Sequence, residues 1–223
     1  MRDATTPSPA VSSATPAQAA SDPAGGAPPR PTRERLILAA AVLFRDKGYS
    51  GVGLSEVLAA AEAPKGSLYH HFPNGKSDLA MAAATWASDQ ILRLIAVSFE
   101  PAASFREGAV TVCHKLAKLF DTSGKWAGCP VSATLFEGPD NAQLHQHAAE
   151  LFEGWIGETA AHARRLGMSE SEARAAAENF YILLQGGWQL ARVRRSSDVI
   201  RALPAQLALP QTAPQAPQPQ KTD

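Results

Sequence analysis

The stretch of sequence most suggestive of chemistry is PKGSLYHHF, at residues 64–72. Leu68 and Phe72 are four positions apart, so on a helix both lie on one face and can anchor it to a core. The rest of the helix surface then carries hydrogen-bond donors: Lys65, Ser67, Tyr69, His70 and His71. Packing alone does not explain a phenol and two imidazoles on so short a helix. Such a face is typical of a helix that contacts nucleic acid.

Positive charge is concentrated around this stretch, although the whole chain of 223 residues has no net formal charge. Between Arg30 and Lys76 there are seven Lys/Arg residues and four acidic residues, an excess of three positive charges. A neutral chain does not favour indiscriminate coating of nucleic acid, but a locally basic region is compatible with a specific DNA-binding face.

Histidine and acidic residues also occur together between positions 145 and 153, as His145, His147, Glu150 and Glu153. A helix separates the two imidazoles by about 200°, whereas a pair that shares one metal ion stands four residues apart. We therefore interpret this group as a solvated helix face. The sequence predicts no metal site, no cofactor and no enzyme.

The two cysteines, Cys113 and Cys129, lack the paired spacing of a metal site. So few cysteines are typical of a protein from a reducing compartment. We interpret both as buried side chains. For Cys129, which precedes Pro130, the alternative is a redox-sensing thiol that makes the protein a thiol-based regulator.

Composition separates a folded part from two tails. Hydrophobic residues make up 45% of the chain, and no apolar run approaches the roughly 18 residues of a membrane span. The N-terminus has no apolar signal-peptide segment, so we expect a cytoplasmic protein without membrane contact. Residues 1–31 and 204–223 are rich in Ala, Pro and small polar residues. We predict that both are disordered tails around a folded part at 32–203.

Helix signals fill this folded part. Thr32 is a predicted N-cap and Gly48 a C-cap of a first helix, and short helices follow at about 54–61 and 64–71. Apolar stripes predict further helices from Lys76 onward, at 103–121 and at 141–166, and a capping box at 169–172 starts another. The predicted fold class is all-α, with a three-helix helix-turn-helix head at 32–79 and a larger helical body at 80–203.

The segment from Ile37 to Ala80 resembles the DNA-binding region of the tetracycline-repressor (TetR) family. Its most specific part is KGSLYHHF followed by Lys76 and Leu79, which is similar to the family pattern G-[ST]-L-Y-x-H-F-x-x-K-x-x-L. The extra residue in PNGK at 73–76 resembles the LmrA/YxaF-type branch of that family. So do GCPV at 128–131 and LQGG at 184–187.

The resemblance implies a role for each matching residue. Tyr69, His71 and Lys76 match positions that bind DNA phosphates. Lys65 and His70 match positions that face the major groove, Ser67 lies near the groove edge, and Gly66 completes the predicted DNA-binding set. Phosphate contacts set position while base contacts give specificity, so Lys65 and His70 are the specificity candidates, with guanine the expected partner of Lys65.

Two residues depart from the family pattern. Gly53 replaces the usual Ser/Thr N-cap, which costs only a few tenths of a kcal/mol. Glu62 replaces the glycine of the turn, and a positive φ at that residue would cost about 1–2 kcal/mol. Neither departure removes a DNA contact.

The resemblance also implies a ligand-responsive transcriptional regulator, with repression as the family default. A homodimer would bind a palindromic operator in double-stranded DNA, and a small lipophilic or aromatic effector would release it. We predict the dimer surface on helices 141–166 and 169–195, where Gly186, Gly187 and Ala191 allow close helix approach. The candidate effector-binding residues are large or soft apolar side chains of the body: Trp86, Phe105, Cys113, Phe120, Trp126, Phe136, Trp155 and Trp188.

The proline-rich tails leave a different class of function open at this point. Pro204, Pro210, Pro214 and Pro217 near the C-terminus are also typical of a helical adaptor that binds proteins. Salt dependence separates the two hypotheses, because counterion release favours DNA binding less as the salt concentration rises, so the affinity for DNA falls steeply.

Overall fold

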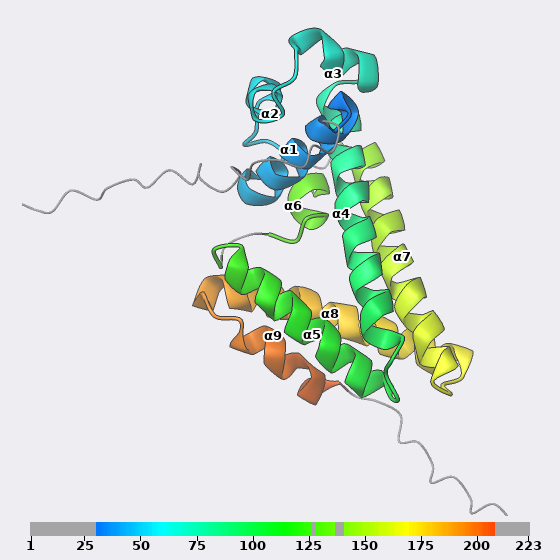
Figure 1. The fold of residues 1–223 in the computed structure, drawn as a ribbon. Coiled ribbons are helices and arrows are strands. Elements are labelled where there is room, and N and C mark those ends of the chain that lie inside the picture. The colour runs from blue at the N-terminus through cyan, green and yellow to red at the C-terminus, as the bar shows by residue number, and fades with distance from the viewer. Residues whose placement is uncertain (1–29, 126–127, 137–140, 208–223) are drawn as a thin grey trace, which may run out of the picture. The chain divides into compact units, whose positions relative to one another are not determined.

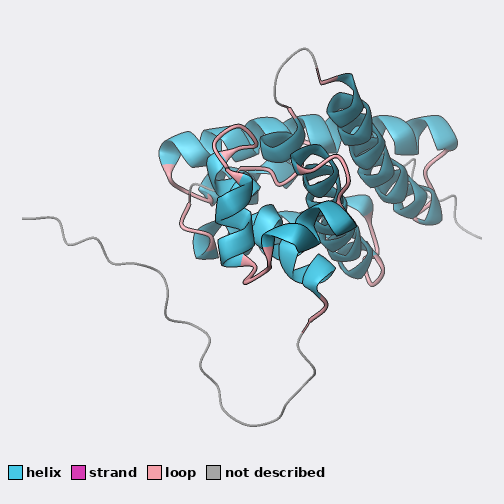
Figure 2. Ribbon diagram, turned by 90° about the horizontal axis from the view of Figure 1, so that it is seen from above, coloured by secondary structure: helices cyan, strands magenta, loops and turns pink. Residues whose placement is uncertain are grey.

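The computed structural model describes residues 30–125, 128–136 and 141–207, and all regular elements within these ranges are helical (Figure 1, Figure 2). The all-α prediction is confirmed. Most of the two predicted tails, and Trp126, lie outside the described residues. In the described ranges, no helix combines the length and the apolar character that a membrane crossing requires.

Three helices form the head: α1 (Thr32–Lys47), α2 (Leu54–Ala60) and α3 (Lys65–His71). Gly48 ends α1 with a φ of 75°, and its N–H donates to the carbonyl of Phe44. This is the predicted C-cap, since only glycine adopts a positive φ without strain. Apolar side chains from all three helices meet in one fully buried core: Leu36, Ala40, Phe44, Val57 and Leu68.

The turn between α2 and α3 contains the predicted departure from the family pattern. Glu62 has a φ of 49°, so a non-glycine residue does adopt the left-handed conformation there. The Glu62 carbonyl accepts a hydrogen bond of 3.1 Å from Nη1 of Arg35 on α1. That contact fixes the turn, and therefore α3, against the first helix.

The long helix α4 (Lys76–Phe99) joins the head to the body. It packs against α1 on the head side and against α5 (Phe105–Thr122) and α7 (Ala142–Arg165) on the body side (Figure 1). Its buried positions include Ala80, Ala83 and Ala84, whose small side chains allow neighbouring helices to approach closely. A change in the tilt of α4 would therefore move side chains in both the head and the body.

Helix α8 (Glu170–Arg194) packs against α7. The predicted capping box is present: Ser169 Oγ accepts from the Glu172 N–H, and the Glu172 carboxylate accepts from the Ser169 N–H at 2.9 Å. The short helix α6 (Ser132–Leu135), which no sequence pattern predicts, packs against α1, α4 and α7.

The body continues past its expected end at residue 203. Helix α9 (Asp198–Ala202) leads into a 3₁₀ helix η1 (Leu203–Gln206), and both cover α5 and α8. Pro204 and Leu207, which were assigned to the tail, are buried. Arg106 of α5 explains this order, because its guanidinium donates to the carbonyls of Pro204 and Leu207.

Candidate functional site

Two buried side chains orient helix α3. Leu68 is fully buried and Phe72 is 3% exposed, so the predicted anchors do face the core of the head. The guanidinium of Arg33 lies 5.6 Å from the centre of the Phe72 ring and adds a cation–π contact from α1. With these two side chains inward, the opposite face of α3 is available to solvent.

The outward face of α3 carries the predicted polar residues. Lys65, Gly66, Tyr69 and His70 are exposed, while Ser67 and His71 are half-buried. The Tyr69 side chain is 55% exposed, although a Cβ at Gly75 would lie only 3.4 Å from its ring. The ring therefore rests against the turn before α4. Ser67 is less available, because its hydroxyl donates to the Pro64 carbonyl at 2.6 Å.

Lys76, the first residue of α4, stands beside this face. Its Nζ lies 4.4 Å from the centre of the Tyr49 ring, and its side chain is half-buried. The preceding Gly75 has a φ of 65°, a conformation that glycine adopts without strain. Lys76 thus holds a positive charge at the helix start next to α3.

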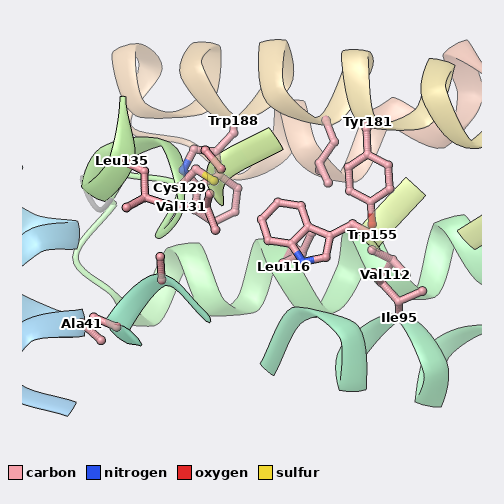
Figure 3. Close-up of a cluster of buried hydrophobic side chains, with 14 of the residues drawn as sticks. Ala41, Ile95, Val112, Leu116, Cys129, Val131, Leu135, Trp155, Tyr181 and Trp188 are labelled. Atoms are coloured by element: carbon pink, nitrogen blue, oxygen red, sulfur yellow. The ribbon is translucent and has the colours of Figure 1, made fainter. Parts of the chain in front are cut away.

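A cavity of about 250 Å³ lies in the body and extends to the head. It is lined by α1, α4, α5, the segment 128–130, α7 and α8, mostly with apolar side chains. Figure 3 shows several of these side chains, with Tyr181 and Trp188 both extending from α8 toward the cluster that contains Trp155. Trp86, Trp155 and Trp188, three of the predicted effector-binding residues, line the cavity.

Four of the other predicted effector-binding residues do not line this cavity. Phe105 packs against Phe99 and Phe180, with ring centres 5.4 and 6.4 Å away, and Cys113 is fully buried. Phe120 lies behind the wall and meets Trp188 edge-on at 5.4 Å. These side chains face the interior between α5 and its neighbours. Phe136 is exposed, and Trp126 is outside the described residues.

Several lining residues were not predicted. Ala41, Val42 and Arg45 come from α1 of the head, and Gln90 and Gln185 come from α4 and α8. The i, i+4 spacing of Ala41 and Arg45 puts them on one helix face, but no local signal in the sequence directs that face toward the body. Cys129, considered above as a redox thiol, also lines the cavity.

Hydrogen bonds already engage two polar groups in the cavity wall. The Trp155 indole N–H donates to the Ser88 hydroxyl at 2.8 Å. The Tyr181 hydroxyl accepts from the Thr159 hydroxyl at 3.4 Å, and burial raises the pKa of Tyr181 well above its usual value. Both side chains therefore offer mainly their aromatic faces to the cavity.

The residues predicted for the dimer surface divide into two groups. Gly187 faces the chain's own η1, since a Cβ there would lie 2.8 Å from the Leu203 side chain, and Ala191 is fully buried. The close approach expected at Gly187 is thus made within the chain. Gly186, by contrast, has open space and belongs to an exposed stripe of α8 at helical spacing: Ile182, Gly186, Leu190 and Val193.

The histidine and acidic group on α7 makes structural contacts. His147 Nε2 lies 2.8 Å from Oγ1 of Thr85 on α4, and its Nδ1 lies 3.8 Å from Glu150. Glu153 pairs with Arg174 of α8, which lowers the pKa of Glu153 through a charged hydrogen bond. These contacts tie α7 to its two neighbours. Within the described ranges, no three His, Cys, Asp or Glu residues are arranged to hold a metal ion.

Two family models match this chain. The model for "Bacterial regulatory proteins, tetR family" matches residues 36–83, and the model for "Transcriptional regulator LmrA/YxaF-like, C-terminal domain" matches residues 106–206. The HTH-type transcriptional regulator LmrA of Bacillus subtilis is 31% identical over 167 residues, which span 74% of this chain and 89% of LmrA. The matches cover both the head and the body.

Solved structures are similar over the same range. The regulatory protein TetR from Rhodobacter sphaeroides superimposes with a TM-score of 0.67 at 25% identity, over 79% of this chain and 96% of that chain. A cysteine mutant of the TetR family regulator CifR, solved with 26-base-pair double-strand operator DNA, gives a TM-score of 0.70 at 22% identity. That match covers 83% of this chain and 100% of the CifR chain. The second similarity shows a shared fold.

Proposed function

This chain belongs to the TetR family of bacterial transcriptional regulators, with an LmrA/YxaF-like body, and we propose that it acts as a homodimeric repressor in the cytoplasm. In this proposal the dimer binds a palindromic operator through α3, and a small lipophilic or aromatic molecule in the cavity releases it. The observation that carries the proposal is the polar, outward face of α3 above its two buried anchors.

The contacts of α3 with DNA divide by position on the helix. Lys65 is its first residue, and the N-terminal residues of a recognition helix contact base edges in the major groove. Lys65, which is exposed, is therefore assigned to bases, and the exposed His70 is assigned to bases because it matches a groove-facing position of the family pattern. Tyr69, His71 and Lys76 are assigned to phosphates, which fix position without selecting sequence. The partly buried Ser67 and the neighbouring Gly66 lie at the edge of the contact.

The exposed stripe on α8 supports the dimer. Ile182 is 72% exposed and Val193 is 81% exposed, so the chain's own helices leave both apolar side chains uncovered. Gly186 lies between them and allows a second helix to approach closely. A two-fold pair of these surfaces would hold two heads at the spacing of about 34–36 Å that successive major-groove half-sites require.

The cavity supports ligand control. Its apolar wall suits a lipophilic molecule, and the wall includes residues of α1 and α4 as well as of the body. A ligand that changes the angle of α4 changes the spacing of the two heads. Nearly complete release requires the ligand to favour the released state by about 5.5 kcal/mol.

The test is selection of DNA from a random duplex library by the purified full chain, followed by affinity measurements at several salt concentrations. We expect enrichment of a palindrome and a steep fall in affinity as salt rises, because several phosphate contacts release counterions. Purified protein that ignores duplex DNA at low ionic strength would overturn the proposal. A helical adaptor would bind without this salt dependence.

A second candidate function is thiol-based regulation through Cys129. The specific observation is position: Cys129 lines the cavity, with Gln185 Nε2 at 3.9 Å from its sulfur, whereas Cys113 is fully buried. An oxidant small enough to enter the cavity would reach Cys129 first. If peroxide lowers operator affinity in the wild type but not in Cys129→Ser, the result supports thiol-based regulation. An equal loss of operator affinity in both proteins excludes it.

A further inference from the structure

Arg45 is the single charged side chain among the described residues that line the cavity. Its side chain is 28% exposed, and its Nε donates to the Asp46 carboxylate at 3.1 Å. In the described part of the chain, its two terminal nitrogens have no hydrogen-bond partner. Because the Asp46 side chain is 46% exposed, water screens much of its charge. The guanidinium therefore keeps its two terminal NH2 groups, with four N–H donors, and a positive charge at the cavity wall.

The remaining polar groups of the wall are weaker or already engaged. Trp155 and Tyr181 bond to Ser88 and Thr159, as described above. The Ser123 hydroxyl donates to the Phe120 carbonyl at 3.0 Å. Gln90 and Gln185 are neutral amides, which can hydrogen-bond to a ligand whether or not the ligand is charged. Arg45 thus supplies the dominant electrostatic feature of an otherwise apolar site.

We propose that the effector of this regulator is an aromatic acid, whose rings lie among the cavity tryptophans and whose carboxylate or other planar anion binds the Arg45 guanidinium. The proposal rests on the proposed function, since it names the chemical class of the effector. Arginine binds carboxylates through two parallel N–H···O bonds, and such charge-assisted bonds are about twice as strong as neutral ones.

The shape of the cavity supports the aromatic part. Trp86, Trp155 and Trp188 line it, and its volume of about 250 Å³ lies just below the usual range of about 300–1,000 Å³ for small-molecule sites. A flat compound with two fused rings and one acidic group is of suitable size. Val42 and Trp86 are themselves partly exposed, so the cavity is open to solvent near Arg45 and an acidic end can stay hydrated there.

A ligand bound at Arg45 also contacts the head directly, because Arg45 belongs to α1. Arg45 follows Phe44, a fully buried core residue of the head, and its own carbonyl accepts from the Gly128 N–H at 3.4 Å. An acid held by Arg45 from α1 and by Trp155 and Trp188 from α7 and α8 bridges head and body. The effector then acts on α1 as well as on α4.

The test uses matched ligands on the full chain: 2-naphthoate, 2-naphthamide and the corresponding pair of anthracene compounds. Acid and amide have nearly the same shape but differ in charge. Binding is followed by quenching of tryptophan fluorescence without DNA, so the result does not depend on operator binding. The proteins are wild type, Arg45→Gln, Arg45→Lys, and Arg93→Gln as a control on an exposed arginine of α4 outside the cavity.

We expect the wild type to bind at least one acid about tenfold or more tightly than its amide, as a charged hydrogen-bonded pair implies. The acid preference should disappear in Arg45→Gln, persist in part in Arg45→Lys and be unchanged in Arg93→Gln. Equal affinity for acid and amide in the wild type, or no binding by any of the four compounds, overturns the proposal. The proposed function fails separately, if the selected duplex is not bound or if no bound compound releases it.

Discussion

The outward face of α3 and the cavity of the body are built in opposite ways. The α3 face comes from seven consecutive residues, 65–71, whose helical spacing alone sends Leu68 inward and Tyr69 outward. The cavity collects side chains from α1, α4, α5, the segment 128–130, α7 and α8, which are brought together only by the tertiary fold. A DNA-binding face can therefore be encoded locally, whereas a ligand site depends on the whole chain.

The most sensitive test of where the cavity ends is alkylation of the two cysteines by iodoacetamide at pH 8. Burial raises the pKa of Cys113 from 9.0 to about 12, so its reactive thiolate is about 1,000-fold scarcer than at the ordinary value. We expect Cys113 to react at least about 1,000-fold more slowly in folded than in urea-unfolded protein. Cys129, in the cavity wall, should be labelled first.

Mass spectrometry of the tryptic peptides distinguishes the two sites, and Cys129→Ser serves as the control that reports Cys113 alone. Equal labelling of both cysteines in the folded protein would mean that the cavity extends past Phe120 and reaches the buried face of α5, where Cys113 lies. In that case Cys113 and Phe120 belong to the cavity wall and not to the closed core.

Sequence patterns predicted those parts of the molecule whose cause is local. Gly48 ends α1 and the Ser169–Glu172 box starts α8, because a positive φ and a reciprocal hydrogen bond involve only neighbouring residues. For Glu62, the departure from the family's glycine sets only the cost of a positive φ, and the residue does adopt a φ of 49°. The boundaries differ by single residues: Pro31, not Thr32, is the N-cap of α1, and Pro64 precedes α3.

Features set by distant contacts were missed or misassigned. Residue type marks Phe105 and Cys113 as large or soft apolar side chains but does not say which face of α5 borders the cavity. The glycine at 187 was attributed to a partner helix, whereas Leu203 of the same chain approaches it. Arg45 looked like part of the basic head, because nothing in the sequence indicates that α1 also borders the cavity.

The second prediction concerns the buried side chain that anchors α3 to the core of the head. Leu68→Ala removes a fully buried side chain and should lower the free energy of unfolding by about 2–5 kcal/mol, since the surroundings relax only in part. Tyr69→Phe, on the exposed neighbour, should change it by less than about 0.5 kcal/mol. Urea unfolding at one fixed protein concentration measures both, because a dimer's apparent stability depends on concentration. Similar losses in both variants would contradict the inward and outward assignment.

The third prediction separates the two kinds of DNA contact on α3. Lys65→Ala should relax the preference at one base position by about 1–3 kcal/mol, because a groove-facing donor is lost. Tyr69→Phe should weaken all sequences alike, since it removes a donor to phosphate. The readout is affinity for the selected palindrome and for each single-base variant of it. Identical specificity profiles in the two variants would refute the division of labour.

The smallest expected effect concerns Glu62, a non-glycine residue with a positive φ at a position where the family pattern has glycine. Glycine at this position avoids the strain of a φ near 49°, about 1–2 kcal/mol, but loses about 1 kcal/mol through greater freedom of the unfolded chain. Glu62→Gly should therefore stabilise the head by roughly 0–1 kcal/mol, and the bond from Arg35 survives because it uses the backbone carbonyl. Glu56→Gly, inside α2 and facing Lys47, has no such strain to relieve and should destabilise by about 1 kcal/mol. If urea unfolding shows a higher free energy of unfolding for Glu62→Gly and a lower one for Glu56→Gly, the difference comes from the backbone conformation at the two positions. A loss of stability in both would mean that the Glu62 side chain, and not its φ, holds the turn.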